Sequence, residues 1–217
     1  MNQDLNQEQQ YALQQVQNSY KLLGDKNIVT CLAGGAREFV EWDHYPEGDV
    51  RDLSHHTQYF YHCHPSSEDE RVKEHGHIHV FFRQDIMPSE SQPVVVSEQY
   101  EKSSGCEDNL THLFAIAINE YGYPCSFFTV NHWVVLGAWY DAVTLASLLD
   151  QFYISGDNRQ YHVVDHWLTH MIKLFKGNLI ELLHKRDSVI NEYSGRQLGE
   201  NVYYDKNLEV TSVLPLV

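Results

Sequence analysis

The chain has 217 residues, 42% of them apolar and 12% aromatic, which is enough to bury a sizeable core. A formal charge of −15 argues against nucleic-acid binding, and no apolar run approaches the ~20 residues that a membrane helix needs. The first ten residues are polar and the four cysteines form no C-x-x-C pair. We therefore expect an acidic, cytoplasmic protein with free thiols, and the sequence gives no indication of its oligomeric state.

The chain begins with a pattern that is typical of a helix. Apolar residues recur at roughly helical spacing over 4–23, and Gly24 can end such a helix. This predicts an N-terminal helix within residues 1–26.

Residues 38–135 are strand-like. A turn is predicted at 119–124, and a long loop or lid over 88–109. The segments that predict strands are 39–45, 58–64, 75–83, 111–118 and 126–135.

The last third is helical within 138–195. Its spacing predicts helices over 139–152 and 160–191, and the tail 202–217 can add an edge strand. We thus predict a single α+β domain over 1–217, with an antiparallel sheet of about four to six strands, an N-terminal helix and two C-terminal helices.

The unusual feature of the composition is 14 histidines, many of them in the strand-like region. Side chains alternate across a strand, so His75, His77 and His79 are expected to share a face, as are His62 and His64. His112 is expected on the same face of its own strand as Phe114 and Ile116. If these strands are neighbours, the imidazoles converge on one side of the sheet.

Histidine is the commonest metal ligand, and its neutral form binds the ion. The span from His75 to His79 is about 13 Å, too long for one ion. We therefore expect a site around His77, with ligands from His62, His64, His79 and His112. Acidic residues in 65–74, including Glu68 and Glu74, can add a ligand or orient an imidazole.

This cluster predicts a soluble protein that binds a transition metal, with Zn or Fe as the first candidates and a metal ion or small-molecule substrate as its partner. A mononuclear non-haem metalloenzyme is one form of this hypothesis, although the sequence does not establish that the chain is an enzyme. The alternative that binds no metal is a protein whose histidines form a structural core.

Two resemblances follow from the same residues. His75-Gly76-His77-Ile78-His79-Val80-Phe81-Phe82-Arg83 resembles the histidine-triad motif of nucleotide hydrolases and transferases, which implies His77 as a catalytic nucleophile. Gly76 departs from the apolar residue usual at that position.

A wider resemblance is to an uncharacterised bacterial family, a domain of unknown function. It implies that these positions act together, and it implies no activity. It rests on Asp43-His44-Tyr45-Pro46, Tyr61-His62-x-His64, Glu74-His75-Gly76-His77-x-His79, Thr111-His112-Leu113 and Asn131-x-Trp133-Val134.

A second group of histidines lies on the last predicted helix. His162, His166 and His170 recur every four residues and form one stripe. The apolar residues that mark the buried face fall largely on the other side. We therefore interpret the stripe as a solvent-facing surface, with a second metal site or a haem contact as the alternatives.

Overall fold

A computed structural model describes residues 5–34, 39–63, 74–97, 109–155, 159–194 and 201–216. The strands are β1 (Tyr45–Asp52), β2 (Thr57–Cys63), β3 (Glu74–Arg83), β4 (Val95–Val96), β5 (Leu110–Asn119), β6 (Pro124–Val130), β7 (Ala138–Trp139) and β8 (Val210–Pro215). The helices are α1 (Gln7–Leu23), α2 (Ile28–Leu32), α4 (His132–Val135), α5 (Ala142–Leu148) and α6 (His162–Ser194).

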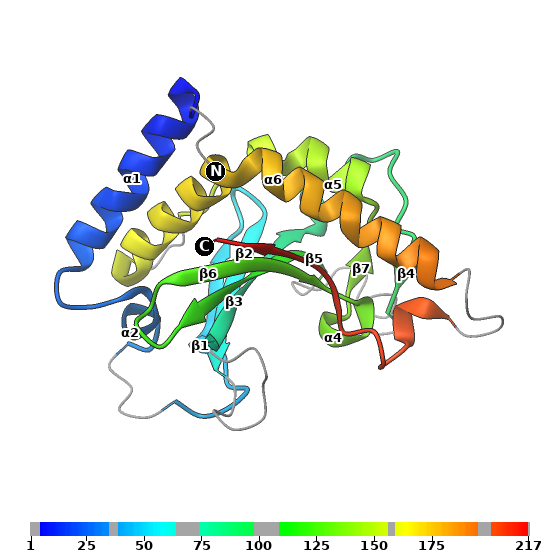
Figure 1. The fold of residues 1–217 in the computed structure, drawn as a ribbon, viewed down its shortest axis with the longest axis horizontal. Helices are drawn as coiled ribbons and strands as arrows, with labels where there is room; N and C mark the ends of the chain where they lie inside the picture. Colours follow the sequence, from blue (N-terminus) through cyan, green and yellow to red (C-terminus); the bar gives the residue numbers. More distant parts are fainter. Residues whose placement is uncertain are drawn as a thin grey trace.

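Six strands form an antiparallel sheet in the order β1-β2-β3-β5-β6-β8 (Figure 1). The predicted α+β class is thereby confirmed, as are the hairpin between β5 and β6 and the edge strand supplied by the tail. The short strands β4 and β7 pair separately. The sheet brings β2, β3 and β5, which carry most of the candidate ligands, side by side.

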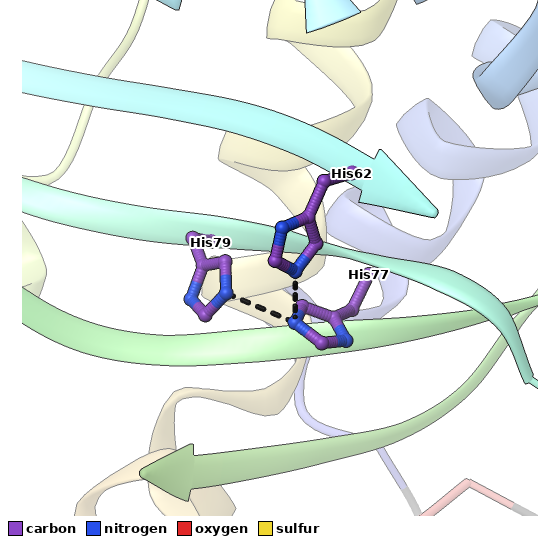
Figure 2. Close-up of side chains that lie close together, drawn as sticks. All are labelled: His62, His77 and His79. Atoms are coloured by element: carbon purple, nitrogen blue, oxygen red, sulfur yellow. Dashed lines mark hydrogen bonds between the residues drawn. The ribbon is translucent and has the colours of Figure 1, made fainter. Parts of the chain in front are cut away.

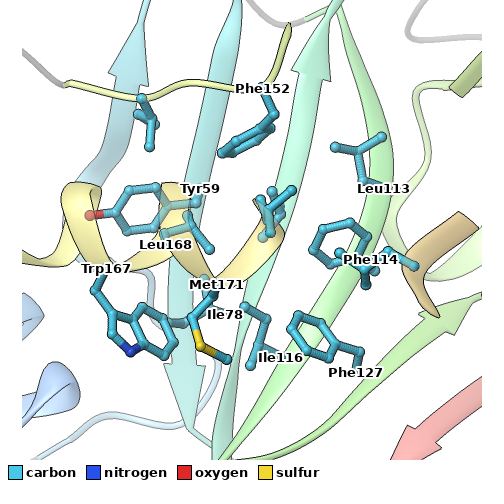
Figure 3. Close-up of a cluster of buried hydrophobic side chains, with 14 of the residues drawn as sticks. Tyr59, Ile78, Leu113, Phe114, Ile116, Phe127, Phe152, Trp167, Leu168 and Met171 are labelled. Carbon is cyan, nitrogen blue, oxygen red and sulfur yellow. The ribbon is translucent and has the colours of Figure 1, made fainter. Parts of the chain in front are cut away.

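Helices cover one face of this sheet (Figure 1). An Asn6 capping box starts α1, which packs along α6. Trp167, Leu168 and Met171 of α6 lie over apolar strand residues such as Ile78 (Figure 3). This main core holds β2, β3 and β5 on the face that packs against α6. The opposite face of these strands is free to carry the side chains of a site.

The other face carries a smaller apolar cluster. Ala115, Ala117, Phe128 and Val130 form it, with partly buried residues of α4 packed against them. The histidines of β2 and β3 project from this same face, so they point away from α6.

Two strands have other bounds than predicted. A strand is predicted at 39–45, but β1 begins only at Tyr45 and continues to Asp52. It can include Pro46 and Gly48 because it is an edge strand. The strand predicted at 126–135 stops at Val130, because the Asn131 side chain accepts a hydrogen bond from the His132 amide and starts α4.

Two further predictions concern loops and membranes. The loop predicted over 88–109 contains β4, and its residues 98–108 lie outside the described part of the chain. Among the residues that the structure describes, no helix is both long enough and apolar enough to cross a membrane.

Candidate metal centre

Three histidines of β2 and β3 meet on the sheet face opposite α6. His62 lies directly across from His77 in the antiparallel register, and His79 lies two residues further along β3. The Nε2 atom of His77 is 2.6 Å from Nε2 of His62 and 2.9 Å from Nε2 of His79 (Figure 2). One ligand atom from each of the three residues lies within 4.8 Å of the other two.

A β-bulge at the start of β3 determines which side chains lie on the same face as these three histidines. The pairing with β5 shifts between Glu74 and Gly76, so the alternation of side chains breaks there. His75 turns to the other face, where Nδ1 contacts the Tyr61 hydroxyl. The prediction that His75 shares a face with His77 and His79 is therefore wrong.

The same bulge gives the site a carboxylate. Oε1 of Glu74 lies 2.7 Å from Nδ1 of His77, and both side chains are buried. Glu74 is thus the first residue of β3, rather than part of the preceding loop. It holds the ring nitrogen of His77 that faces away from the other two imidazoles.

A second bulge places His112 beside this group. Phe81 pairs with His112 and Val80 with Phe114, so Leu113 is the extra residue. As a result, Leu113 and Phe114 both pack into the main core. His112 lies on the opposite face from Phe114, contrary to expectation. The Nε2 atom of His112 is 3.0 Å from Nδ1 of His79.

Burial keeps the inner histidines neutral. Desolvation lowers the pKa of His79 well below its ordinary value, and charge on His77 and His112 would lower it further. Desolvation and the positive charge of Arg186 lower the pKa of His112 to about 3. Both rings are therefore in the neutral form that a metal or a second imidazole requires near neutral pH.

Small side chains on β5 make room for the imidazoles. Ala117 lies opposite His77, and Ala115 lies opposite His79. Phe128 then reaches over from β6 and meets the His77 ring edge-on, with centroids 5.0 Å apart. The histidine pattern alone does not predict these residues, although the alternation of alanine with larger apolar residues on β5 could have indicated them.

The remaining predicted site residues divide into two groups. His64 and Glu68 lie outside the described residues. The roles of His112 as a ligand and of His77 as a nucleophile stay predictions. Nδ1 of His77 contacts Glu74, and Nε2 contacts two imidazoles.

Comparison with known proteins identifies the family of the chain. Residues 8–216 match a family model described as a domain of unknown function (DUF6969). No curated protein and no solved structure matches the chain. The match covers nearly the whole sequence and agrees with the expectation of an uncharacterised family, so the chain belongs to this domain-of-unknown-function family.

Proposed function

We propose that the chain binds one transition-metal ion through the Nε2 atoms of His62, His77 and His79. The observation that carries the proposal is that Nε2 of His77 lies 2.6 Å from Nε2 of His62 and 2.9 Å from Nε2 of His79. One ligand atom from each of the three lies within 4.8 Å of the other two, on a buried sheet face. In a tetrahedral site with bonds near 2.05 Å, ligand nitrogens lie about 3.3 Å apart. The contacts of 2.6 and 2.9 Å therefore need to open by less than about 1 Å.

The outer nitrogens of two of these rings support the proposal. A metal-bound Nε2 carries no proton, so Nδ1 of the same neutral ring must carry one. Glu74 is placed to accept that proton's hydrogen bond from His77, and Nε2 of His112 is placed to accept it from His79. Outer partners of this kind orient metal-binding imidazoles.

The competing hypothesis is a structural histidine core. Without metal, the Nε2–H groups of His62 and His79 would share the single lone pair on Nε2 of His77, and Nε2–H of His112 would donate to Nδ1 of His79. The two hypotheses thus differ in the tautomer of His79: Nδ1–H with metal and Nε2–H without. Nitrogen-15 NMR of the imidazoles distinguishes these tautomers.

Three histidine ligands favour Zn, with Fe as the next candidate. Such a set leaves at least one coordination position for another group. A zinc-bound water in a three-histidine site has a pKa near 7, so it supplies hydroxide at neutral pH. In its finer form, the proposal is a mononuclear metalloenzyme that acts on a small molecule at that position.

The test is metal analysis of the full chain purified without a histidine tag. We expect wild type to bind about one equivalent of metal more than His77→Gln, as purified or after loading with Zn²⁺. His77→Gln should abolish this tight binding. His75→Gln is the matched control, because His75 belongs to the same motif and turns to the other face, where it contacts Tyr61.

Circular dichroism and thermal unfolding check that each variant is folded. The more exposed His62 provides a second substitution, His62→Gln, if His77→Gln does not fold. Less than a tenth of an equivalent after loading, or equal binding by wild type and a folded His77→Gln variant, overturns the proposal. A structural core would instead show stability lost with no metal bound.

A further inference from the structure

A cavity of about 630 Å³ lies between α1, the first turns of α6 and residues 153–155. Because the histidines of β2 and β3 point away from α6, this cavity is separate from the candidate metal centre. Its chemistry comes mainly from α6. Polar residues on its lining include Lys21, His162, Asp165, His166, Thr169 and His170.

The histidine stripe on α6 lines this cavity, and burial increases along it from His162 to His170. His166 is partly buried and His170 is 8% exposed, while His162 is exposed. The expected solvent-facing surface is therefore wrong for His170, because α1 packs beside α6 at this point. The ring of Tyr11 on α1 meets His170 edge-on.

Internal acceptors fix which ring nitrogen of each histidine carries the proton. Nδ1 of His170 lies 2.7 Å from the carbonyl oxygen of His166, which can only accept. Nδ1 of His166 lies 3.0 Å from the hydroxyl of Ser19, whose own proton is donated to the carbonyl of Gln15. Both Nδ1 atoms therefore donate, and each neutral ring keeps a lone pair on Nε2.

The two rings are also well placed to act together. They lie one helical turn apart, with centroids 4.2 Å apart. Histidines at positions i and i+4 of a helix share one face, which is the spacing used by helical zinc sites. Burial lowers the pKa of both His166 and His170, which favours the neutral, metal-binding form.

We propose that His166 and His170 form a second metal site, which holds a divalent transition-metal ion through their Nε2 atoms. The remaining coordination positions face the cavity, where water or a small molecule can occupy them. Asp165 on the same lining and the net charge of −15 favour a cation there, whereas Lys21 opposes it. The proposal does not depend on the site formed by β2 and β3.

The test is equilibrium dialysis of Zn²⁺ against the full, untagged chain carrying His77→Gln. This substitution removes the site proposed at His62, His77 and His79, called the sheet site below. We expect one remaining equivalent. His170→Gln should weaken it at least about tenfold, because even an outer partner of a metal ligand contributes that much to affinity. His166→Gln should weaken Zn²⁺ binding to the same extent. The glutamine amide can still donate a hydrogen bond to Ser19, so the substitution removes the metal ligand and keeps this contact.

His184→Gln is the matched control, because His184 is an exposed histidine of the same helix, outside the cavity lining. It should leave the affinity unchanged. With Cu²⁺ in place of Zn²⁺, electron paramagnetic resonance should show nitrogen couplings that His166→Gln reduces.

Equal Zn²⁺ affinity with and without folded His166→Gln and His170→Gln substitutions overturns the second site. An equal loss in His184→Gln also overturns it, because it marks non-specific binding. Comparison of wild type with His77→Gln tests the sheet site separately. If wild type binds one equivalent of Zn²⁺ and His77→Gln binds none, the result supports the sheet site and refutes the site at His166 and His170.

Discussion

At the scale of single residues, Glu74 is the carboxylate that the bulge brings to the candidate metal centre. Its Oε1 lies 2.7 Å from Nδ1 of His77. A carboxylate that accepts this N–H fixes the ring with Nε2 toward the metal and makes the imidazole a better donor. In the proposed metal site, Glu74 would thus act on the metal through His77.

We therefore expect Glu74→Gln to weaken Zn²⁺ binding at the sheet site by about 10- to 100-fold, with the fold retained. The amide has almost the same shape as the carboxylate but lacks its charge. A competition titration against a chelator of known affinity measures the change. The background is His170→Gln, so that only the sheet site is counted.

Glu120→Gln controls for the loss of one negative charge nearby, since Glu120 is exposed in the turn after β5. Its affinity should match that of the parent. If Glu74→Gln and Glu120→Gln bind equally well, Glu74 has no positioning role and its contact with His77 is structural.

At the scale of elements, the candidate centre depends on how closely β2 approaches β3. Gly76 pairs with Cys63 at this point. A Cβ atom on Gly76 would clash with the carbonyl oxygen of His62 and lie 2.7 Å from the Cα atom of Cys63. Only glycine allows the two backbones to keep the register that sets His62 opposite His77.

Gly76→Ala should accordingly lower the free energy of unfolding by about 3 kcal/mol, since the obstacle is backbone that cannot move independently. Urea unfolding monitored by circular dichroism measures this. Gly177→Ala is the control: Gly177 is exposed on α6 with no atom within 4 Å of an added Cβ. It should stabilise the protein by up to about 1 kcal/mol. Equal stability of Gly76→Ala and wild type would show that the strands can separate without cost.

The same elements show what the sequence could and could not predict. Strict alternation on β2 and β3 correctly indicated that His62, His77 and His79 share a face. The bulges could not be predicted, because no local pattern marks where a ladder gains a residue. Alternation therefore predicts the wrong face for His75, and the polar segment before β3 wrongly predicts a loop position for Glu74.

Helical periodicity had a comparable limit. It correctly grouped His162, His166 and His170 into one stripe on α6. It could not show that α1 packs beside that stripe and half encloses it, because periodicity describes one helix and not its neighbours. Residues far apart in sequence, such as Ser19 and His166, meet only in the folded chain.

At the scale of the whole molecule, α6 carries one group of histidines and also acts electrostatically on the group that lies on the far face of the sheet. Arg186, a fully buried residue of α6, lies over the Trp139 ring, and its charge lowers the pKa of His112. Burial of neutral histidine therefore couples the stability of the entire fold to pH.

The sign of this coupling follows from His112. Its pKa falls from an ordinary value of 6.5 to about 3 in the folded protein. Between these values the unfolded chain binds a proton that the folded chain does not, so acid favours unfolding. The stability that neutral His112 contributes is fully present above pH 6.5 and is lost as the pH falls toward 3. His79, whose pKa is also lowered, acts in the same direction.

For the metal-free protein, we expect His112→Gln to flatten the pH dependence of stability below pH 6.5, where the ordinary pKa of histidine lies. One group with this shift contributes a slope of up to about 1.4 kcal/mol per pH unit. Urea unfolding of wild type and His112→Gln from pH 7.5 to about pH 5 measures the difference in slope. His184→Gln controls for the loss of an exposed histidine and should follow wild type. Parallel curves for wild type and His112→Gln would mean that His112 titrates normally in the folded state, and hence that the histidines on this sheet face are open to solvent.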